Sequence, residues 1–460
     1  RAIDQLVERG WVQRRQPINS VLTDGNISFE SVGLSDEDMK NIQQVYIVAC
    51  GSAYHVGMVA QYVIEELTSL SVRVELASEF RYRQMKLAKN SLAIIISQSG
   101  ETADSLAALR LCKEKGVKTL GIVNVVGSSI AREADNVFYT LAGPEISVAT
   151  TKAYSCQLVA AYLLAMQFAK ARGEISDERF AQLVEEINTI PEKIEKILED
   201  KERLQWFASK VVNIKDAFFI GRGIDYAVGM EGSLKLKEIS YIHSEAYAAG
   251  ELKHGPISLI EDGTVVFSVV TQSALYEKTI SNMVEVKSRG AKLFGLTTYG
   301  NYAMEDVADF TVYTPRIDNL FAASLSVVPL QLLSYYVSVG KGYDVDKPRN
   351  LAKTSLFAVY IFAVLWLTLL DRQWGERQAE LVPFWEVRNL LENISIKYLR
   401  NFWLVQIFGN IAMFIPLGVL LPYLCGITKF KSVFLMSLAF SAGIEITQYI
   451  TGRGLCEFDD

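Results

Sequence analysis

The amino-acid sequence contains the same pattern twice, and this internal repeat limits the fold more than any other feature. Residues 45–57, VYIVACGSAYHVG, correspond to residues 217–229, AFFIGRGIDYAVG, at an offset of 172 residues. Further along, residues 116–124, GVKTLGIVN, correspond to residues 290–298, GAKLFGLTT, at an offset of 174. Offsets that agree this closely over separate blocks indicate two copies of one folding unit.

Each copy alternates short apolar runs with stretches of helical spacing. Such runs are typical of strands that are buried on both faces of a parallel sheet. We therefore predict an α/β fold with two tandem doubly wound lobes, at residues 45–174 and 211–353. Residues 1–44 are predicted to form a linker with N-terminal helices, and residues 175–210 to form connecting helices with a solvated face. Ligands of such sheets bind at the carboxyl ends of the strands.

One predicted strand end carries a hydroxyl-rich loop. Residues 97–102, SQSGET, follow the apolar run at residues 92–96 and precede a helix-like stretch. Hydroxyls, an amide and a glycine at a helix start can form an anion pocket, which suits a phosphate without a metal. The same residue types also occur in a simple cap and turn, so the loop alone leaves both interpretations open. The matching Thr271, Gln272 and Ser273 of the second copy lack the following glycine, so we expect one copy to bind and the other to support it.

Composition separates the C-terminal part of the chain from the rest. Residues 356–370, 402–425 and 433–450 are apolar runs without Lys, Arg or Asp, and a bilayer core takes about 20 such residues. We predict that residues 354–460 form an all-α membrane segment of about three helices. The net charge of −6 lies on the first 350 residues, because 9 basic and 9 acidic residues cancel from Leu351 onward. This acidic part argues against nucleic acid as a partner.

The cysteines do not indicate a metal site. The five Cys residues form no CxxC pair and have no His at ligand spacing. We therefore predict no metal and no disulfide framework, and a reducing cytosol fits the first 350 residues.

Four motifs together resemble a known enzyme family. CGSA at residues 50–53, SQSGET, the stretch EGSLKLKEISYIHSEAYAAGELKHGP at residues 231–256 and DVDKPRNLAK at residues 344–353 closely resemble the isomerase half of glutamine:fructose-6-phosphate aminotransferase. The resemblance implies two sugar isomerase (SIS) lobes, a homodimer, no cofactor, and fructose 6-phosphate and glucosamine 6-phosphate as ligands.

The same resemblance implies a set of ligand-binding residues. The predicted phosphate ligands are Ser52, Ser97, Gln98, Ser99 and Thr102. Further predicted substrate contacts are Cys50, Gly51 and Val148. Ala53 stands where many relatives have Ser, so one phosphate contact is expected to be missing.

A carboxylate is the predicted base. Moving a carbonyl between C2 and C1 requires a group that takes a proton from one carbon and returns it to the next. The resemblance assigns this role to Glu238, with Lys235 three residues earlier on the same helix face. Spacing alone favours a surface stripe in which Glu231 pairs with Lys235, and the resemblance reverses that preference.

Two further residues complete the predicted catalytic set. His254 precedes Gly255 and Pro256 in a turn that leaves its imidazole free to point into a cleft, and the resemblance assigns it to opening of the sugar ring. Lys353 matches the lysine that forms a Schiff base with the open-chain ketose. A lysine just before an apolar run is also typical of the edge of a membrane helix.

The C-terminal part resembles the VanZ-like membrane family, through residues 382–389, 408–422 and 445–460. We therefore expect a membrane-associated protein that contacts the lipid bilayer through residues 354–460 and has its SIS lobes in the cytoplasm. Relatives of the isomerase half carry a glutaminase domain with a nucleophilic cysteine, and no cysteine precedes Cys50. The expected activity is therefore isomerisation or ammonia-dependent synthesis of glucosamine 6-phosphate. A non-catalytic sugar-phosphate sensor and an artefactual gene fusion remain as alternatives.

Overall fold

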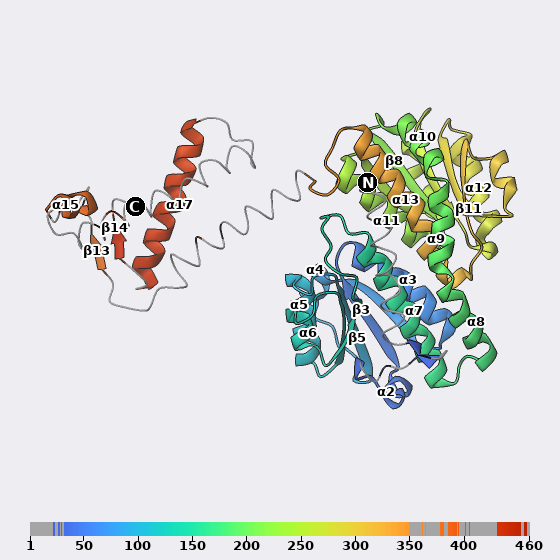
Figure 1. Cartoon of the computed structure of the whole chain (residues 1–460), viewed down its shortest axis with the longest axis horizontal. Helices are drawn as coiled ribbons and strands as arrows, with labels where there is room; N and C mark the ends of the chain where they lie inside the picture. The colour runs from blue at the N-terminus through green and yellow to red at the C-terminus, as the bar shows by residue number, and fades with distance from the viewer. Residues whose placement is uncertain are drawn as a thin grey trace. The chain divides into compact units, whose positions relative to one another are not determined.

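Two parallel sheets with the same strand order form the framework of residues 1–348 (Figure 1). The computed structural model describes residues 22–23, 26–27, 29, 32–348, 361, 364, 378–380, 385–392, 394, 401, 404, 430–451 and 455–457. Residues 349–460 make up a second unit, which is described separately.

Lobe 1 is ordered β4-β3-β5-β6-β7 and lobe 2 is ordered β9-β8-β10-β11-β12, with every neighbouring pair parallel. The lobe 1 strands are β3 (Gln44–Ala49), β4 (Ser71–Leu76), β5 (Ser91–Ser97), β6 (Lys118–Val123) and β7 (Asn136–Tyr139). The lobe 2 strands are β8 (Asp216–Gly221), β9 (His243–Ala248), β10 (Val265–Val270), β11 (Lys292–Thr298) and β12 (Phe310–Thr314). The matching orders confirm the predicted pair of doubly wound lobes.

The helices lie between and outside the strands. Lobe 1 contains α2 (Asp36–Asn41), α3 (Ser52–Leu67), α4 (Ala77–Phe80), α5 (Ala103–Glu114), α6 (Ser129–Glu133) and α7 (Lys152–Arg172). The predicted connecting helices are α8 (Asp177–Asn188), α9 (Ile190–Glu199) and α10 (Lys201–Val211). Lobe 2 contains α11 (Ile224–Ser240), α12 (Tyr276–Lys287), α13 (Ala322–Gly340) and the short 3₁₀ helices η2 (Ala249–His254), η3 (Pro256–Leu259), η4 (Ser273–Leu275), η5 (Tyr302–Asp306) and η6 (Asn319–Phe321). A short antiparallel pair, β1 (Leu22–Thr23) and β2 (Asn26–Ile27), precedes lobe 1.

One apolar core joins the two lobes. Side chains alternate along each strand, so Val45 and Ile47 of β3 enter this shared core while Tyr46 and Val48 face a separate outer cluster. The shared core also contains buried residues of α3, α7, α11 and α13. The lobes therefore pack against each other through the inner helices, and α11 is packed against both α3 and α13.

One helix of lobe 2 is long and apolar enough to cross a membrane. It covers residues Asn319–Gly340, and 78% of its most apolar window is buried in the fold. Because α13 within this stretch belongs to the shared core, the apolar composition reflects burial in protein. Among the described residues of the second unit, the shorter helix Lys431–Ile444 is also apolar.

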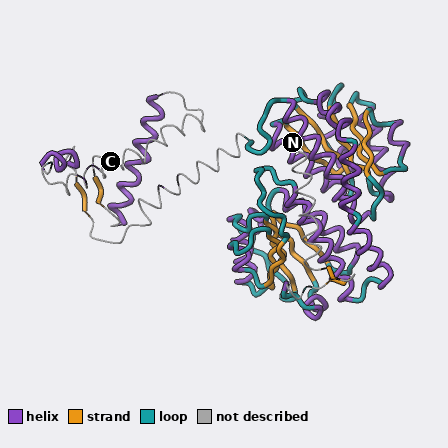
Figure 2. The backbone as a smooth tube through the Cα atoms, in the orientation of Figure 1, coloured by secondary structure: helices purple, strands orange, loops and turns teal. Residues whose placement is uncertain are grey.

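The described residues of the second unit include both helices and strands (Figure 2). They form α15 (Trp385–Glu392), α17 (Phe430–Thr451) and a parallel pair of strands, β13 (Gln378–Glu380) and β14 (Leu455–Glu457). The predicted apolar span at residues 433–450 lies within α17. The strand pair departs from the all-α prediction, which considered only apolar runs, because these extended segments bond their backbones to each other. The predicted spans at residues 356–370 and 402–425 lie outside the described residues, apart from positions 361, 364 and 404.

Candidate active site

The loops after β3 and β5 meet at the point where ligands bind in this type of sheet. In lobe 1 the chain passes from β3 to β4, which lies on one side of β3, and then to β5, which lies on the other side of β3. The strand order therefore reverses between β3 and β5, and this is the switch point of the sheet. Helix α3 begins here after Gly51, whose φ of 56° and ψ of −133° favour glycine. Helix α5 begins here after residues 97–102. Two helix N-termini therefore face the crevice, where backbone N–H groups favour an anion.

Hydrogen bonds within residues 97–102 shape the predicted phosphate loop. Ser97 Oγ accepts from the Gly100 N–H at 3.1 Å and lies 3.0 Å from Thr102 Oγ1. Ser99 Oγ accepts from the Glu101 N–H at 3.2 Å. Gly100 has a φ of 66°, and a Cβ there would lie 2.0 Å from Ser128 Oγ. Only glycine therefore allows this loop to turn tightly against the Ser128 side chain.

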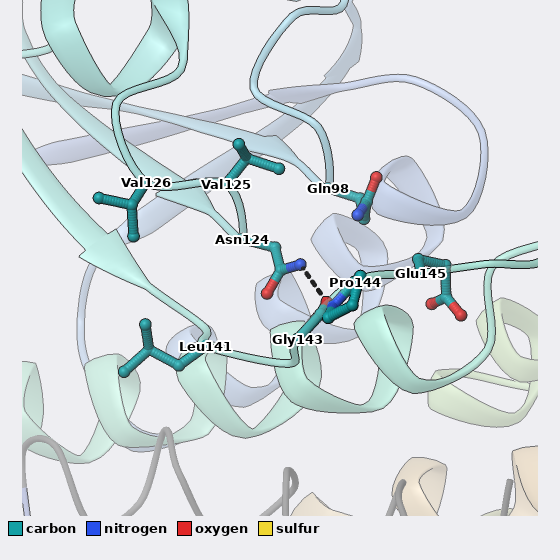
Figure 3. Close-up of a pocket in the computed structure, with 8 residues that line it drawn as sticks. All are labelled: Gln98, Asn124, Val125, Val126, Leu141, Gly143, Pro144 and Glu145. Atoms are coloured by element: carbon teal, nitrogen blue, oxygen red, sulfur yellow. Dashed lines mark hydrogen bonds between the residues drawn. The ribbon is translucent and has the colours of Figure 1, made fainter.

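Gln98 borders a hollow beside this loop (Figure 3). The hollow has a volume of about 580 Å³. It is lined by Gln98, Asn124, Val125, Val126, Leu141, Gly143, Pro144 and Glu145. Asn124 Nδ2 donates to the Gly143 carbonyl at 2.8 Å, which joins the segments after β6 and β7 that line the hollow. The hollow gives the loop open space on the Gln98 side.

The predicted base belongs to a buried cluster of charged side chains on α11. Glu231, Lys235 and Glu238 share one helix face through their spacing of four and three residues. Lys235 Nζ lies 2.5 Å from Glu238 Oε2 and 3.5 Å from Glu231 Oε1. Glu231 and Lys235 are 0% and 2% exposed, so the alternative of a surface stripe is wrong. The Glu238 side chain is 21% exposed, although its Oε2 atom beside Lys235 is buried, so Glu238 lies at the edge of the cluster.

Lobe 1 supplies the remaining partners of Glu231. Ser52 Oγ donates to Glu231 Oε1 at 2.9 Å, and His55 Nδ1 lies 2.8 Å from Glu231 Oε2. Ser52 and His55 occupy the first turn of α3, which follows the strand next to β5 and its loop at residues 97–102. A continuous series of polar contacts therefore leads from the start of α3 through Glu231 and Lys235 to Glu238.

Burial and neighbouring charges shift the pKa values of Glu238 and Lys235 in opposite directions. Burial raises the pKa of Glu238, and the Lys235 ammonium offsets only part of this effect. Burial acts to lower the pKa of Lys235, but Glu231 and Glu238 outweigh it, so the Lys235 pKa is raised. A carboxylate with a raised pKa is suited to both accepting and returning a proton.

The structure brings some predicted residues together and leaves others apart. Cys50 is half-buried, with its sulfur 4.0 Å from Ser105 Oγ, and Gly51 caps α3. Val148 is 45% exposed, and its N–H donates to the Asp346 carbonyl at 3.1 Å. His254 ends η2 and is exposed, and the described hydrogen bonds and ion pairs do not connect it to Glu238. Lys353 lies outside the described residues.

Two residues of the site carry contacts that the sequence analysis missed. His55 was not predicted to have a role, and Ser52 was predicted as a phosphate ligand although its hydroxyl proton is donated to Glu231. The partners are 176 and 179 residues apart in sequence, so no local pattern predicts these contacts. The only available signal was the position of both residues in the repeated glycine block at residues 45–57.

The duplicated sheets, with a hydroxyl-rich loop at one switch point and a helix that carries a buried charged cluster beside it, define a two-lobed α/β protein. The SIS domain family profile matches residues 38–167 and 210–340, and the chain belongs to this family. The VanZ/LLP1 family profile matches residues 357–460.

Curated relatives and a solved structure agree with this assignment. The chain is 55% identical over 352 residues to glutamine–fructose-6-phosphate aminotransferase (isomerizing) of Clostridium tetani, and 50% identical over 352 residues to that of Clostridium acetobutylicum. Each match covers 76% of this chain and 58% of the relative, so the chain spans little more than half the length of these proteins. It also resembles the C-terminal domain of glucosamine-fructose-6-phosphate aminotransferase from Francisella tularensis, with 39% identity and a TM-score of 0.71 over 74% of this chain and 96% of that one.

Proposed function

We propose that the two SIS lobes bind fructose 6-phosphate and convert it to glucosamine 6-phosphate with ammonia as the nitrogen donor. The observation that carries this proposal is the partly buried Glu238 side chain, linked through Lys235 and Glu231 to the start of α3 beside the hydroxyl-rich loop. The relatives named above are isomerizing aminotransferases, which supports the same reaction class.

The loop at residues 97–102 is the proposed phosphate site. Side chains of Ser97, Gln98, Ser99 and Thr102 and the free N–H groups at the start of α5 would hold the phosphate oxygens. Ser52 would contribute through its backbone N–H, because its hydroxyl proton is already donated to Glu231. With the phosphate held there, C1 and C2 of the open-chain sugar would extend toward α11.

Glu238 is the proposed proton carrier. Its carboxylate removes a proton from C1 of the C2 imine and returns that proton to C2, while O1 becomes the aldehyde oxygen and its hydrogen passes to the nitrogen. The Lys235 ammonium beside it stabilises the carboxylate and the negative charge that develops on the sugar. His254 is the proposed group for ring opening.

Lys353 is the proposed Schiff-base lysine. The tail that leads to it is held beside lobe 1, where Ser147 Oγ donates to the Val345 carbonyl at 3.3 Å and the Val148 N–H donates to the Asp346 carbonyl. Lys353 lies seven positions after Asp346, which allows a reach of up to roughly 23 Å from a point next to the predicted substrate contact Val148.

The proposal extends to the assembly and its location. The chain forms a homodimer with its SIS lobes in the cytoplasm, and residues 354–460 contact the bilayer as a VanZ-like domain. Exposed apolar side chains along α17 support contact with lipid: Phe434, Leu435, Met436, Leu438, Ile446, Tyr449 and Ile450 are each 45–61% exposed. Recovery of the full chain in the membrane fraction after a high-salt wash is the expected result, and full release into the supernatant would contradict it.

The test of the activity is an assay of the purified full chain with fructose 6-phosphate and an ammonium salt. We expect glucosamine 6-phosphate, detected by mass spectrometry, and its formation should require Glu238. Tight binding of fructose 6-phosphate without product or isomerisation would instead identify a sugar-phosphate sensor. Absence of both binding and turnover would overturn the proposal.

A further inference from the structure

Ala53 and Asp225 occupy the same position in the two lobes. Each is the second residue of the helix that follows the first strand, α3 in lobe 1 and α11 in lobe 2. The capping glycines before these helices have nearly identical conformations, with φ and ψ of 56° and −133° at Gly51 and of 58° and −130° at Gly223. The crevice between β8 and β10 is therefore the structural counterpart of the crevice between β3 and β5.

The Asp225 carboxylate lies in this second crevice and is bound by the loop after β10. Asp225 Oδ2 accepts from the Thr271 N–H at 2.7 Å and from the Gln272 N–H at 3.2 Å, and Asp225 Oδ1 accepts from the Thr271 hydroxyl. Thr271 and Gln272 correspond to Ser97 and Gln98 of the lobe 1 phosphate loop. Backbone N–H groups and a hydroxyl at a parallel strand end are also the donors that bind a phosphate oxygen.

We propose that the loop after β10 is a second oxyanion pocket whose permanent occupant is the Asp225 carboxylate, so that the chain binds phosphate in lobe 1 alone. The lobe 1 part rests on the function proposed above, whereas the lobe 2 part does not. Lobe 1 keeps its pocket open because Ala53 has no side chain that reaches the loop. A single residue at the repeat position thus decides which lobe takes the ligand.

The charge state of Asp225 is consistent with this role at neutral pH. Asp225 is 2% exposed, and burial raises its pKa to about 6 although the bonds from Thr271 and Gln272 act to lower it. Above pH 7 the side chain is therefore mostly an anion, held by donors of the kind that an external anion would require.

The test counts inorganic phosphate bound to the full chain at pH 7.5 by equilibrium dialysis with radiolabelled phosphate. We expect one phosphate per chain for the wild type, two for Asp225→Ala, none for Ala53→Asp, and one for the double variant, in which the site has moved to lobe 2. The controls are Asp306→Ala, which removes an exposed carboxylate of lobe 2, and Ala53→Ser, both with one phosphate per chain.

The outcomes separate this inference from the proposed function. If Asp225→Ala binds no more phosphate than the wild type, the second pocket does not exist and the inference is overturned. If the wild type binds none and Asp225→Ala binds one, the inference stands and the proposed lobe 1 phosphate site fails. If Asp225→Ala does not fold, Ala53→Asp decides the matter, because unchanged phosphate affinity in that variant contradicts the equivalence of the two positions.

Discussion

The two lobes have the same strand order and the same glycine-capped helix start, yet their crevices are filled differently. In lobe 1 the loop after β5 turns tightly through Gly100 and leaves the Ser99 and Thr102 side chains partly exposed. In lobe 2 Ala274 stands at the matching position, the loop forms the 3₁₀ turn η4, and its donors are taken by Asp225. The two crevices therefore differ in whether a carboxylate of the adjoining helix occupies the donors of the loop.

The difference shows how a duplicated fold can divide two tasks. Lobe 2 contributes α11, whose charged residues face lobe 1 and are held by Ser52 and His55 of α3. On the function proposed here, lobe 1 binds the anionic end of the substrate and lobe 2 supplies the acid-base group. Four variants break or sharpen this comparison.

Removal of the Glu238 charge should have the largest effect. A general base contributes about 10²–10⁴-fold to a rate, so Glu238→Gln should lower exchange of solvent deuterium into C1 of fructose 6-phosphate by that factor. Glu195→Gln, at an exposed position of α9, is the matched control with unchanged exchange. Wild-type exchange in Glu238→Gln, measured by NMR, would refute the role.

Substitution of the buried Glu231 should lower the free energy of unfolding more than substitution of an acidic residue in a partly exposed ion pair. Glu231→Gln leaves the buried Lys235 with one carboxylate partner fewer, and loss of one member of a buried pair costs about 3–5 kcal/mol in the free energy of unfolding. Glu186→Gln breaks a partly exposed pair with Lys193 and should cost under about 1 kcal/mol. Urea denaturation measures both values, and equal losses would show that the α11 cluster is not special.

The two loops should respond differently to loss of one hydroxyl. On the proposed function, Ser99→Ala removes a hydrogen bond to the substrate phosphate, worth about 1.5 kcal/mol or more, so KM for fructose 6-phosphate should rise about tenfold or more. Ser273→Ala changes the matching residue of lobe 2 and should leave KM unchanged. A similar rise in both variants would mean that the lobes do not differ in binding.

The pH dependence of exchange should move with Lys235. Glu238 acts as a carboxylate, so exchange is lost as the pH falls through its raised pKa, above the pH at which an ordinary glutamate is protonated. The Lys235 ammonium lowers the Glu238 pKa. Lys235→Met removes this effect and raises the Glu238 pKa, so the acid limb of the exchange profile should move to higher pH. Lys237→Met, at an exposed position on the same helix, should leave it in place, and a shift toward lower pH in Lys235→Met would contradict the assignment.

The sheets could be predicted from the sequence because their signals are local. Apolar runs such as residues 92–96 become buried strands whatever lies elsewhere in the chain, and the repeat offset indicates that both lobes share one order. The strand–loop–helix order around the SQSGET motif could be predicted for the same reason, since the three segments are contiguous.

The contacts between the lobes could not be predicted in this way. Helical spacing shows that Glu231, Lys235 and Glu238 share a face of α11, but it does not tell whether that face meets solvent or another helix. The alternative of a surface stripe fails because α11 packs between α3 and α13. Asp225 was likewise missed, since its significance depends on the loop after β10 being folded against it.

The central claim is that the substrate phosphate binds the lobe 1 loop while the reacting carbons face α11 of lobe 2. A crystal structure of the full chain with fructose 6-phosphate tests it most directly. The account predicts the phosphate within hydrogen-bonding distance of residues 97–102, and C1 and C2 next to the Glu238 carboxylate. A phosphate bound at the loop after β10, or sugar carbons remote from Glu238, would contradict it.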